Sequence, residues 1–298
     1  MNSLDQLEEK SIYLIRESYS HYKVRLAMLW SIGKDSTVML HLTRKAFLGK
    51  VPFPLVHVDT SVKIPEMITF RDQTVKRLNK EINLDMIIGQ NKVALEKNET
   101  FFNGNLTRLQ CCQTLKTEAL FKTTQGVFPR NRFDRETESY TKDDKNEIFD
   151  ALIVGIRSDE EGTRSKERYF SKRSPQQNWD IENLPAELWN QFNTDLHPGE
   201  SVRVHPILDW SEKNIWQYIE REKIQVTDLY FSNANNERYR SLGCAPCTKP
   251  IKSTAKNPTE ILHELEFGSL SKLGERSGRS QDQEDQNGLE TLRRNGYM

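Results

Sequence analysis

A short apolar run that passes directly into a polar turn constrains the fold of this chain more than any other feature. Residues 24–30 (VRLAMLW) are mostly apolar, and Ser31–Ser36 (SIGKDS) follow without a break. From Thr37 to Phe47, apolar residues recur at helical spacing. An apolar run bounded by a turn is typical of a strand buried on both faces. The segment therefore predicts a strand, a tight loop and a helix.

The same alternation of apolar runs and helical patterns recurs along the chain. Because strands that alternate with helices usually align in parallel, we predict an α/β fold, a doubly wound parallel sheet with helices on both faces. The further expected strands are 54–59, 85–88, 150–155 and 202–207, and the expected helices are 4–22, 64–78 and 211–222. We expect Ser211 to cap the last of these helices, with Asn214 at its third position.

Two stretches lie outside this alternation. Residues 121–148 are polar and charged, and we expect a mobile insertion or lid there. From about residue 269 the chain is rich in Gly, Ser and Gln, so we expect a tail that is extended on the surface or ordered by a partner. The pattern suggests a nucleotide-binding domain over 1–230 and a C-terminal region over 231–298 that carries a CxxC motif.

The charge balance and the termini limit the classes of protein that fit. The 298 residues include 43 basic and 43 acidic ones, so the chain as a whole does not attract nucleic acid, and an anionic partner must meet a local patch. No apolar stretch is long enough to span a membrane, and the first ten residues lack the apolar run of a signal peptide. We expect a cytoplasmic protein without a disulfide framework.

The Ser31–Ser36 loop has the composition of an anion site. Unpaired N–H groups at a helix N-terminus bind phosphate well, Gly33 lets the backbone approach, and Lys34 adds a charge. The spacing is neither that of a Walker A loop nor that of a dinucleotide-binding GxGxxG turn. An ordinary helix cap is the alternative. We expect Lys34 to face solvent and therefore to be replaceable without unfolding the chain.

This loop resembles the SGGxDS pyrophosphate loop of the ATP pyrophosphatases, a superfamily of the adenine-nucleotide alpha-hydrolase type, although Ile32 replaces the first glycine. Residues 57–60 (HVDT), 155–161 (GIRSDEE) and the basic run 164–168 resemble the sulfate adenylyltransferase small subunit and the phosphoadenylylsulfate reductases. The resemblance implies that ATP and Mg²⁺ bind, that Asp35 or Asp59 helps to place the metal, and that Lys34, Asp35 and Arg157 are catalytic. The implied ATP-binding residues are Trp30, Ser31, Ile32, Gly33, Lys34, Asp35, Ser36, Asp59, Gly155, Arg157, Arg164, Lys166 and Arg168.

Four cysteines form two pairs, Cys111–Cys112 and Cys244–Cys247. Such a set suits zinc or an iron–sulfur cluster, and inert or redox-active cysteines are the remaining alternatives. The pairs and their flanks resemble the adenylylsulfate reductases, which implies that Cys111, Cys112, Cys244 and Cys247 hold one [4Fe-4S] cluster. Residues 275–298 contain no cysteine, so the C-terminal nucleophile of those reductases is missing.

A sulfate-adenylyltransferase-like body with four paired cysteines most resembles the ATP pyrophosphatases of bacterial DNA phosphorothioation, of the Ssp and Dnd kinds. That resemblance implies adenylation of a DNA backbone phosphate with release of pyrophosphate, a cysteine desulfurase as sulfur donor, and other DNA-modification subunits as partners. One alternative is sulfate activation by a sulfate adenylyltransferase small subunit with a GTPase large subunit. Another is a non-catalytic subunit that senses nucleotide.

Overall fold

A computed structural model of the chain describes residues 3–145, 147–179, 186–268, 270, 273–279 and 294. Among these residues, eight strands form one mixed sheet in the order β5-β4-β3-β2-β1-β6-β8-β7. Their bounds are β1 Leu26–Leu29, β2 Leu55–Val58, β3 Met86–Gly89, β4 Arg130–Asp134, β5 Ser139–Lys142, β6 Ala151–Ile153, β7 Phe170–Arg173 and β8 Ser201–Val204.

The five central strands, β3-β2-β1-β6-β8, are all parallel, which confirms the predicted α/β sheet. The chain runs outward from β1 through β2 to β3 and then returns to the other side of β1 to form β6. The strand order therefore reverses between β1 and β6. In open α/β sheets, ligands bind at the carboxyl ends of the strands beside such a reversal.

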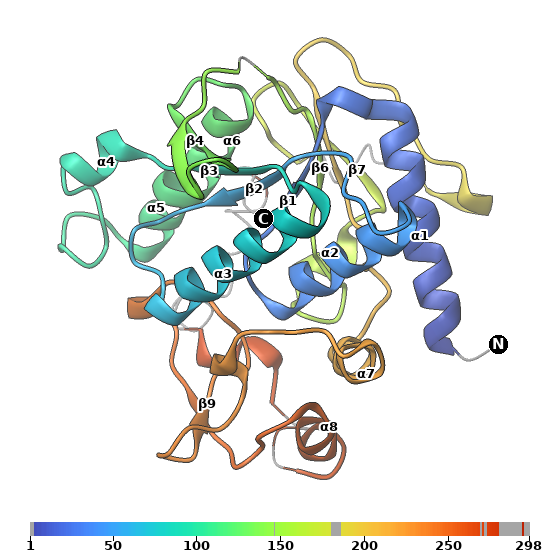
Figure 1. Cartoon of the computed structure of the whole chain (residues 1–298), viewed down its shortest axis with the longest axis vertical. Coiled ribbons are helices and arrows are strands. Elements are labelled where there is room, and N and C mark those ends of the chain that lie inside the picture. The colour runs from blue at the N-terminus through green and yellow to red at the C-terminus, as the bar shows by residue number, and fades with distance from the viewer. Residues whose placement is uncertain are drawn as a thin grey trace.

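Helices cover both faces of the sheet, as predicted (Figure 1). Alternate residues of one strand enter two different cores: Met28 packs with helices α1, α2 and α3, whereas Leu29 packs in the opposite core with α6. The helices are α1 Ser3–Tyr22, α2 Lys34–Ala46, α3 Pro65–Ile82, α4 Lys92–Glu96, α5 Arg108–Cys112, α6 Ala119–Thr124, α7 Glu212–Glu222 and α8 Pro258–Phe267.

The segment 121–148, which we expected to be a mobile lid, contributes β4 and β5 to the sheet. These strands form an antiparallel hairpin, and β4 pairs antiparallel with β3. Asp143, whose side chain is buried, accepts from Arg130 Nε and Arg132 Nε at 3.0 Å each. The sequence is polar because β5 is an edge strand and because buried ion pairs replace apolar packing, not because the segment is loose.

The C-terminal part gathers on one side of the sheet, below α2 and α3 in Figure 1. It contains α7, α8 and a small hairpin of β9 (Glu237–Arg238) and β10 (Ile251–Lys252). Ser211 caps α7 in a capping box with Asn214, as the sequence predicts. The division into domains at residue 230 stays a prediction. None of the described helices combines the length and apolar character that crossing a membrane requires.

We expected a surface tail from about residue 269, and this expectation is wrong for residues 275–279. Residues 275–278 form a 3-10 turn, and Glu275, Arg276 and Arg279 are buried against the rest of the protein. Most of the segment that follows, to residue 298, lies outside the described residues.

Candidate active site

The Ser31–Ser36 segment, here called the phosphate loop, contains the turn after β1 and the first three residues of α2, at the point where the strand order reverses. Gly155, just beyond β6, lies against the start of α2. A Cβ at Gly155 would stand 3.2 Å from the backbone nitrogen of Ser36, closer than backbone atoms accept without shifting. The two strand ends therefore approach as closely as they do because residue 155 has no side chain.

Ile32 carries the unusual backbone conformation of this loop. Its φ is 71°, in the left-handed region, which is a strained conformation for a β-branched residue. Gly33 has an ordinary φ of −69°. Ile32 is buried with Ile64 and Met67, so packing compensates for the strain. The loop thus keeps a geometry that suits glycine although the glycine of the related motif is absent.

A cavity of about 140 Å³ opens beside the loop. Six of its lining residues are cationic and three are anionic, so the neutral chain has a locally positive pocket. Sites for small molecules usually measure about 300–1,000 Å³, so a nucleotide needs more room than this conformation offers. The charged lining residues are Lys34, Lys63, Lys116, Arg164, Arg276, Arg279, Asp35, Glu160 and Glu275.

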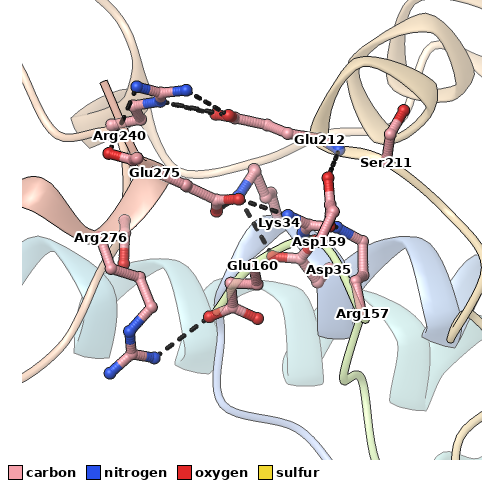
Figure 2. Close-up of polar contacts among 12 residues, drawn as sticks. Lys34, Asp35, Arg157, Asp159, Glu160, Ser211, Glu212, Arg240, Glu275 and Arg276 are labelled. Carbon is pink, nitrogen blue, oxygen red and sulfur yellow. Dashed lines mark hydrogen bonds and ion pairs between the residues drawn. The ribbon is translucent and has the colours of Figure 1, made fainter. Parts of the chain in front are cut away.

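A buried charge network closes the floor of this pocket (Figure 2). Lys34 Nζ contacts Asp35 Oδ2 at 3.2 Å and also binds Glu275. Arg157 bonds to both of these carboxylates and lies 3.0 Å from Asp159. Lys34 is only 1% exposed, so the expectation that it faces solvent is wrong: the C-terminal turn covers it. The two cations hold the pKa of Glu275 well below its usual range, although burial opposes this.

The position of Glu275 is set by the residues just before it. Arg240 makes a buried ion pair with Glu212 at 2.8 Å and donates to the carbonyl of Leu273 at 2.8 Å (Figure 2). Asp159 in turn accepts from the N–H of Glu212 at the start of α7, at 2.8 Å. The helix α7 is thereby tied both to the loop after β6 and to the turn that carries Glu275.

The four cysteines line a second, smaller pocket. Cys111 and Cys112 lie at the end of α5, directly before a π-helical turn over Gln113–Glu118, and Cys244 and Cys247 come from the C-terminal part. Unusual helical turns of this kind often occur at functional sites. Lys116 lines both this pocket and the cavity beside the phosphate loop, so the two sites are neighbours.

The cysteines differ in acidity. Although burial opposes it, the pKa of Cys244 falls to about 7, because Lys116 and Lys63 are close and Thr60 Oγ1 lies 3.2 Å from its sulfur. Burial raises the pKa of Cys111 and of Cys247. Within the described part of the chain, no three His, Cys, Asp or Glu side chains stand so that they could hold a metal ion. The structure therefore brings the four thiols to one pocket without forming a metal-binding arrangement.

Comparison with known families identifies the family of the chain. The profile of the phosphoadenosine phosphosulfate reductase domain matches residues 25–250. The chain belongs to this family.

Curated relatives within the family extend over the whole chain. A sulfate adenylyltransferase subunit 2 of Rhizobium tropici is 38% identical, and the match covers 99% of this chain and 93% of the relative. One from Marinomonas sp. (strain MWYL1) is 37% identical over 100% of this chain and 98% of the relative. Like these relatives, the protein is an adenylyl-transferring enzyme that uses ATP.

These relatives correct the main functional hypothesis. The sequence resemblance pointed to DNA phosphorothioation, but the curated relatives are named as sulfate adenylyltransferase subunits. The cysteine pairs had weighed toward phosphorothioation, and they say nothing about the acceptor that receives the adenylyl group. The hypothesis of DNA as substrate is therefore wrong, and with it the cysteine desulfurase and DNA-modification partners lose their support.

Among solved structures, the FMN adenylyltransferase of Candida glabrata in complex with FAD and inorganic pyrophosphate is similar with a TM-score of 0.50. It is 18% identical, and the match covers 83% of this chain and 64% of that enzyme. At this level of identity the likeness supports the α/β fold alone.

The ATP-binding residues that the sequence resemblance predicted fall into two groups, those that line the cavity and those that do not. Those that line the cavity are Ser31, Gly33, Lys34, Asp35, Ser36, Gly155 and Arg164. Arg157 supports the floor from below through its bonds to Asp35 and Glu275. Trp30, Ile32, Asp59, Lys166 and Arg168 are not among the residues that line it. Trp30 is buried in the hydrophobic core, and its Nε1 donates to Thr37 Oγ1 at 3.2 Å. Asp59 stabilises a turn by accepting a hydrogen bond from the N–H of Ser61.

Sequence reasoning missed several residues of the site. Their charges were visible in the sequence, but their positions depend on contacts across more than a hundred residues, which no local pattern reports. The one local signal was a concentration of Glu and Arg in 275–279, which stood out in a stretch otherwise rich in Gly, Ser and Gln. The missed residues are Lys63, Tyr230, Glu275, Arg276 and Arg279.

Replacing Ile32 with glycine or alanine separates strain from packing. Both changes remove the side chain that packs on Ile64 and Met67, but only glycine adopts a φ of 71° without penalty. We expect both variants to be less stable than the wild type, and Ile32→Gly to be more stable than Ile32→Ala by about 1 kcal/mol. Urea unfolding measures the difference. An alanine variant as stable as the glycine variant would contradict the left-handed conformation.

Replacing Glu275 with glutamine tests whether this carboxylate occupies the place of a phosphate. In the wild type, the carboxylate of Glu275 occupies Lys34 and Arg157 through charge-assisted hydrogen bonds and so competes with the phosphates of ATP for them. The neutral glutamine competes less, so ATP should bind roughly tenfold more tightly in calorimetry. The melting temperature should fall, because two buried cations lose their partner.

The matched control for this change is Glu266→Gln. Glu266 lies on α8 and pairs with Lys213 at the surface. Its replacement by glutamine therefore removes the same charge at a place away from the pocket. We expect its ATP affinity to equal that of the wild type. Weaker ATP binding in folded Glu275→Gln would show that the carboxylate assists the nucleotide instead of competing with it.

Proposed function

We propose that this protein is the small subunit of a sulfate adenylyltransferase, which transfers the adenylyl group of ATP to sulfate and releases pyrophosphate. The observation that carries the proposal is the full-length similarity to curated proteins of that name, at 36–38% identity. The cationic pocket beside the phosphate loop supports it, because nucleotide, sulfate and pyrophosphate are all anions.

The phosphate loop would hold the β- and γ-phosphates of ATP. The start of α2 offers N–H groups at the positive end of a helix, and Lys34 and Arg157 supply charge that stabilises the departing pyrophosphate. Mg²⁺ commonly binds through one or two carboxylates together with phosphate oxygens and water. Asp35, a carboxylate that lines the pocket, would hold Mg²⁺ in that way.

A second group of cations would receive the acceptor. Lys63, Lys116 and Arg279 line the pocket. The guanidinium of Arg279 packs closely against Gly243, because a Cβ at residue 243 would stand 2.0 Å from Arg279 Nη1. Burial and the neighbouring charges of Lys116 and Arg279 lower the pKa of Lys63. A dianion bound among these side chains would relieve that crowding of like charges.

The reaction needs cations more than it needs a base. A sulfate oxygen forms a bond to the α-phosphorus of ATP, the bond from that phosphorus to the bridging oxygen breaks, and pyrophosphate leaves with the electron pair. Sulfate is already ionised at neutral pH, so no group has to remove a proton from it. Accordingly, among the described residues that line the pocket there is no histidine.

We propose a large-subunit partner as well, because the curated relatives are numbered as second subunits of their enzymes. A GTPase large subunit is the partner that the sequence resemblance implies. The cytoplasmic location likewise stays a prediction.

Exchange of labelled pyrophosphate into ATP tests the proposed reaction. We expect exchange that depends on added sulfate, measured with and without the large subunit. We expect Asp35→Asn to lower this exchange at least tenfold, because the proposed Mg²⁺ site loses its carboxylate ligand.

Asp144→Asn is the control for that experiment. Asp144 is a largely exposed carboxylate paired with Lys142 on the edge hairpin, and its loss should leave exchange unchanged. Exchange that proceeds equally without sulfate would mean that the acceptor is another compound.

We also propose that the cysteine pocket holds a [4Fe-4S] cluster. Four thiols are a ligand set that such clusters take, and Lys116 and Arg108 would offset the charge of the thiolates. The space between the thiols is only about 10 Å³ as they stand, so they must move apart to hold a cluster. No step of the proposed reaction depends on it.

Metal analysis after anaerobic purification decides this question. We expect iron and acid-labile sulfide in equal amounts, a brown protein, and loss of both in Cys244→Ser, while ATP binding measured by calorimetry persists. Zinc in place of iron would assign a structural zinc site, and protein without metal would show that the thiols act on their own.

A further inference from the structure

Tyr230 reaches the phosphate loop from the C-terminal part of the chain. It ends a 3-10 turn over Asp228–Tyr230, its side chain is 1% exposed, and it lines the pocket. Its hydroxyl oxygen accepts from the backbone N–H of Lys34 at 2.8 Å. This N–H belongs to the first residue of α2 and is one of the groups that would otherwise point at an anion.

Within the described part of the chain, the hydroxyl of Tyr230 accepts a hydrogen bond but donates none. A phenol hydroxyl is both a donor and an acceptor, and here the oxygen already accepts from Lys34. Among the residues that the structure describes, none accepts the hydroxyl proton of Tyr230. Buried donors are nearly always paired in folded proteins. A buried donor that lines a pocket and lacks an acceptor points to a ligand oxygen.

The neighbouring side chains hold the ring of Tyr230 in place. The ring of Trp216 on α7 stands edge-on to the Tyr230 ring, with centroids 5.5 Å apart and planes at 82°. Lys34 Nζ lies 5.9 Å from the centroid of the same ring. Because the oxygen is bonded to the loop and the ring packs against α7, the hydroxyl group stays at the wall of the pocket, where a ligand oxygen can reach it.

The protonation state suits a donor. Burial raises the pKa of Tyr230 above its ordinary value, despite the opposing charge of Lys34, so the hydroxyl keeps its proton at neutral pH. The bond that it accepts from the positive end of α2 also polarises the O–H group, which strengthens it as a donor.

We propose that Tyr230 donates a hydrogen bond to a β- or γ-phosphate oxygen of ATP, and to the pyrophosphate that leaves. This inference rests on the proposed function in that the ligand is the polyphosphate end of the nucleotide. It assigns to the site a neutral donor that joins the loop to the C-terminal part, in addition to the cations already described.

Calorimetric titration with magnesium pyrophosphate tests the assignment. Tyr230→Phe removes one oxygen and keeps the ring, and we expect it to weaken pyrophosphate binding about fivefold. Binding of AMP, which lacks the β- and γ-phosphates, should stay within about twofold of the wild type. The matched control is Tyr22→Phe, which removes a buried hydroxyl that donates to the carbonyl of Thr194 far from the pocket.

A second substitution keeps the test decisive if the phenylalanine variant does not fold. Incorporation of 3-fluorotyrosine at position 230 preserves the side chain and makes its hydroxyl a stronger donor, so pyrophosphate should bind more tightly. A purely structural role would change pyrophosphate and AMP binding alike. Unchanged pyrophosphate affinity in folded Tyr230→Phe, or weaker binding by the fluorinated protein, would overturn the proposal.

The two hypotheses fail in different ways. Wild-type protein that binds pyrophosphate but shows no sulfate-dependent exchange would remove sulfate as the acceptor and leave the role of Tyr230 open to the same titrations. Wild-type protein that binds no pyrophosphate would overturn both.

Discussion

The buried network of Lys34, Asp35, Arg157 and Glu275 holds together three parts of the chain that are far apart in sequence. It joins the turn after β1, the turn after β6 and the C-terminal 3-10 segment. A buried charge left without its partner is destabilising by about 3–5 kcal/mol, so removal of any of the four side chains should lower the free energy of unfolding. The network therefore links the integrity of the fold to the electrostatics of the pocket beside the phosphate loop.

The sequence was sufficient for those parts of the fold that depend on local pattern. The passage from a strand into a helix across Ser31–Ser36 and the capping box of Ser211 follow from neighbouring residues, although α2 begins at Lys34, earlier than the helical pattern from Thr37 indicated. The positions of Tyr230 and Glu275 could not be predicted, because they lie 196 and 241 residues from Lys34 and meet it only through tertiary packing. Exposure of Lys34 was misjudged for the same reason.

Function was harder to predict than fold because the most conspicuous residues do not identify the substrate. Two cysteine pairs do converge on one pocket, as their spacing suggested, but thiols carry no information about which oxyanion accepts the adenylyl group. In the reaction that we propose, that choice depends on cations such as Lys63 and Arg279, which belong to segments without a recognisable motif. Similarity to curated relatives over the full length of the chain was needed to correct the hypothesis that DNA accepts the adenylyl group.

The outermost strands of the sheet have a further consequence. A strand at the edge of a sheet exposes unpaired backbone groups that can recruit another chain, and charged side chains discourage this. β5 reads Ser-Tyr-Thr-Lys, is mostly exposed, and ends at Lys142, which is 79% exposed. β7, at the opposite edge, contains the partly exposed Lys172. The polar hairpin of β4 and β5 thus shields the apolar parallel strands from intermolecular pairing and protects the protein against fibrillar self-association.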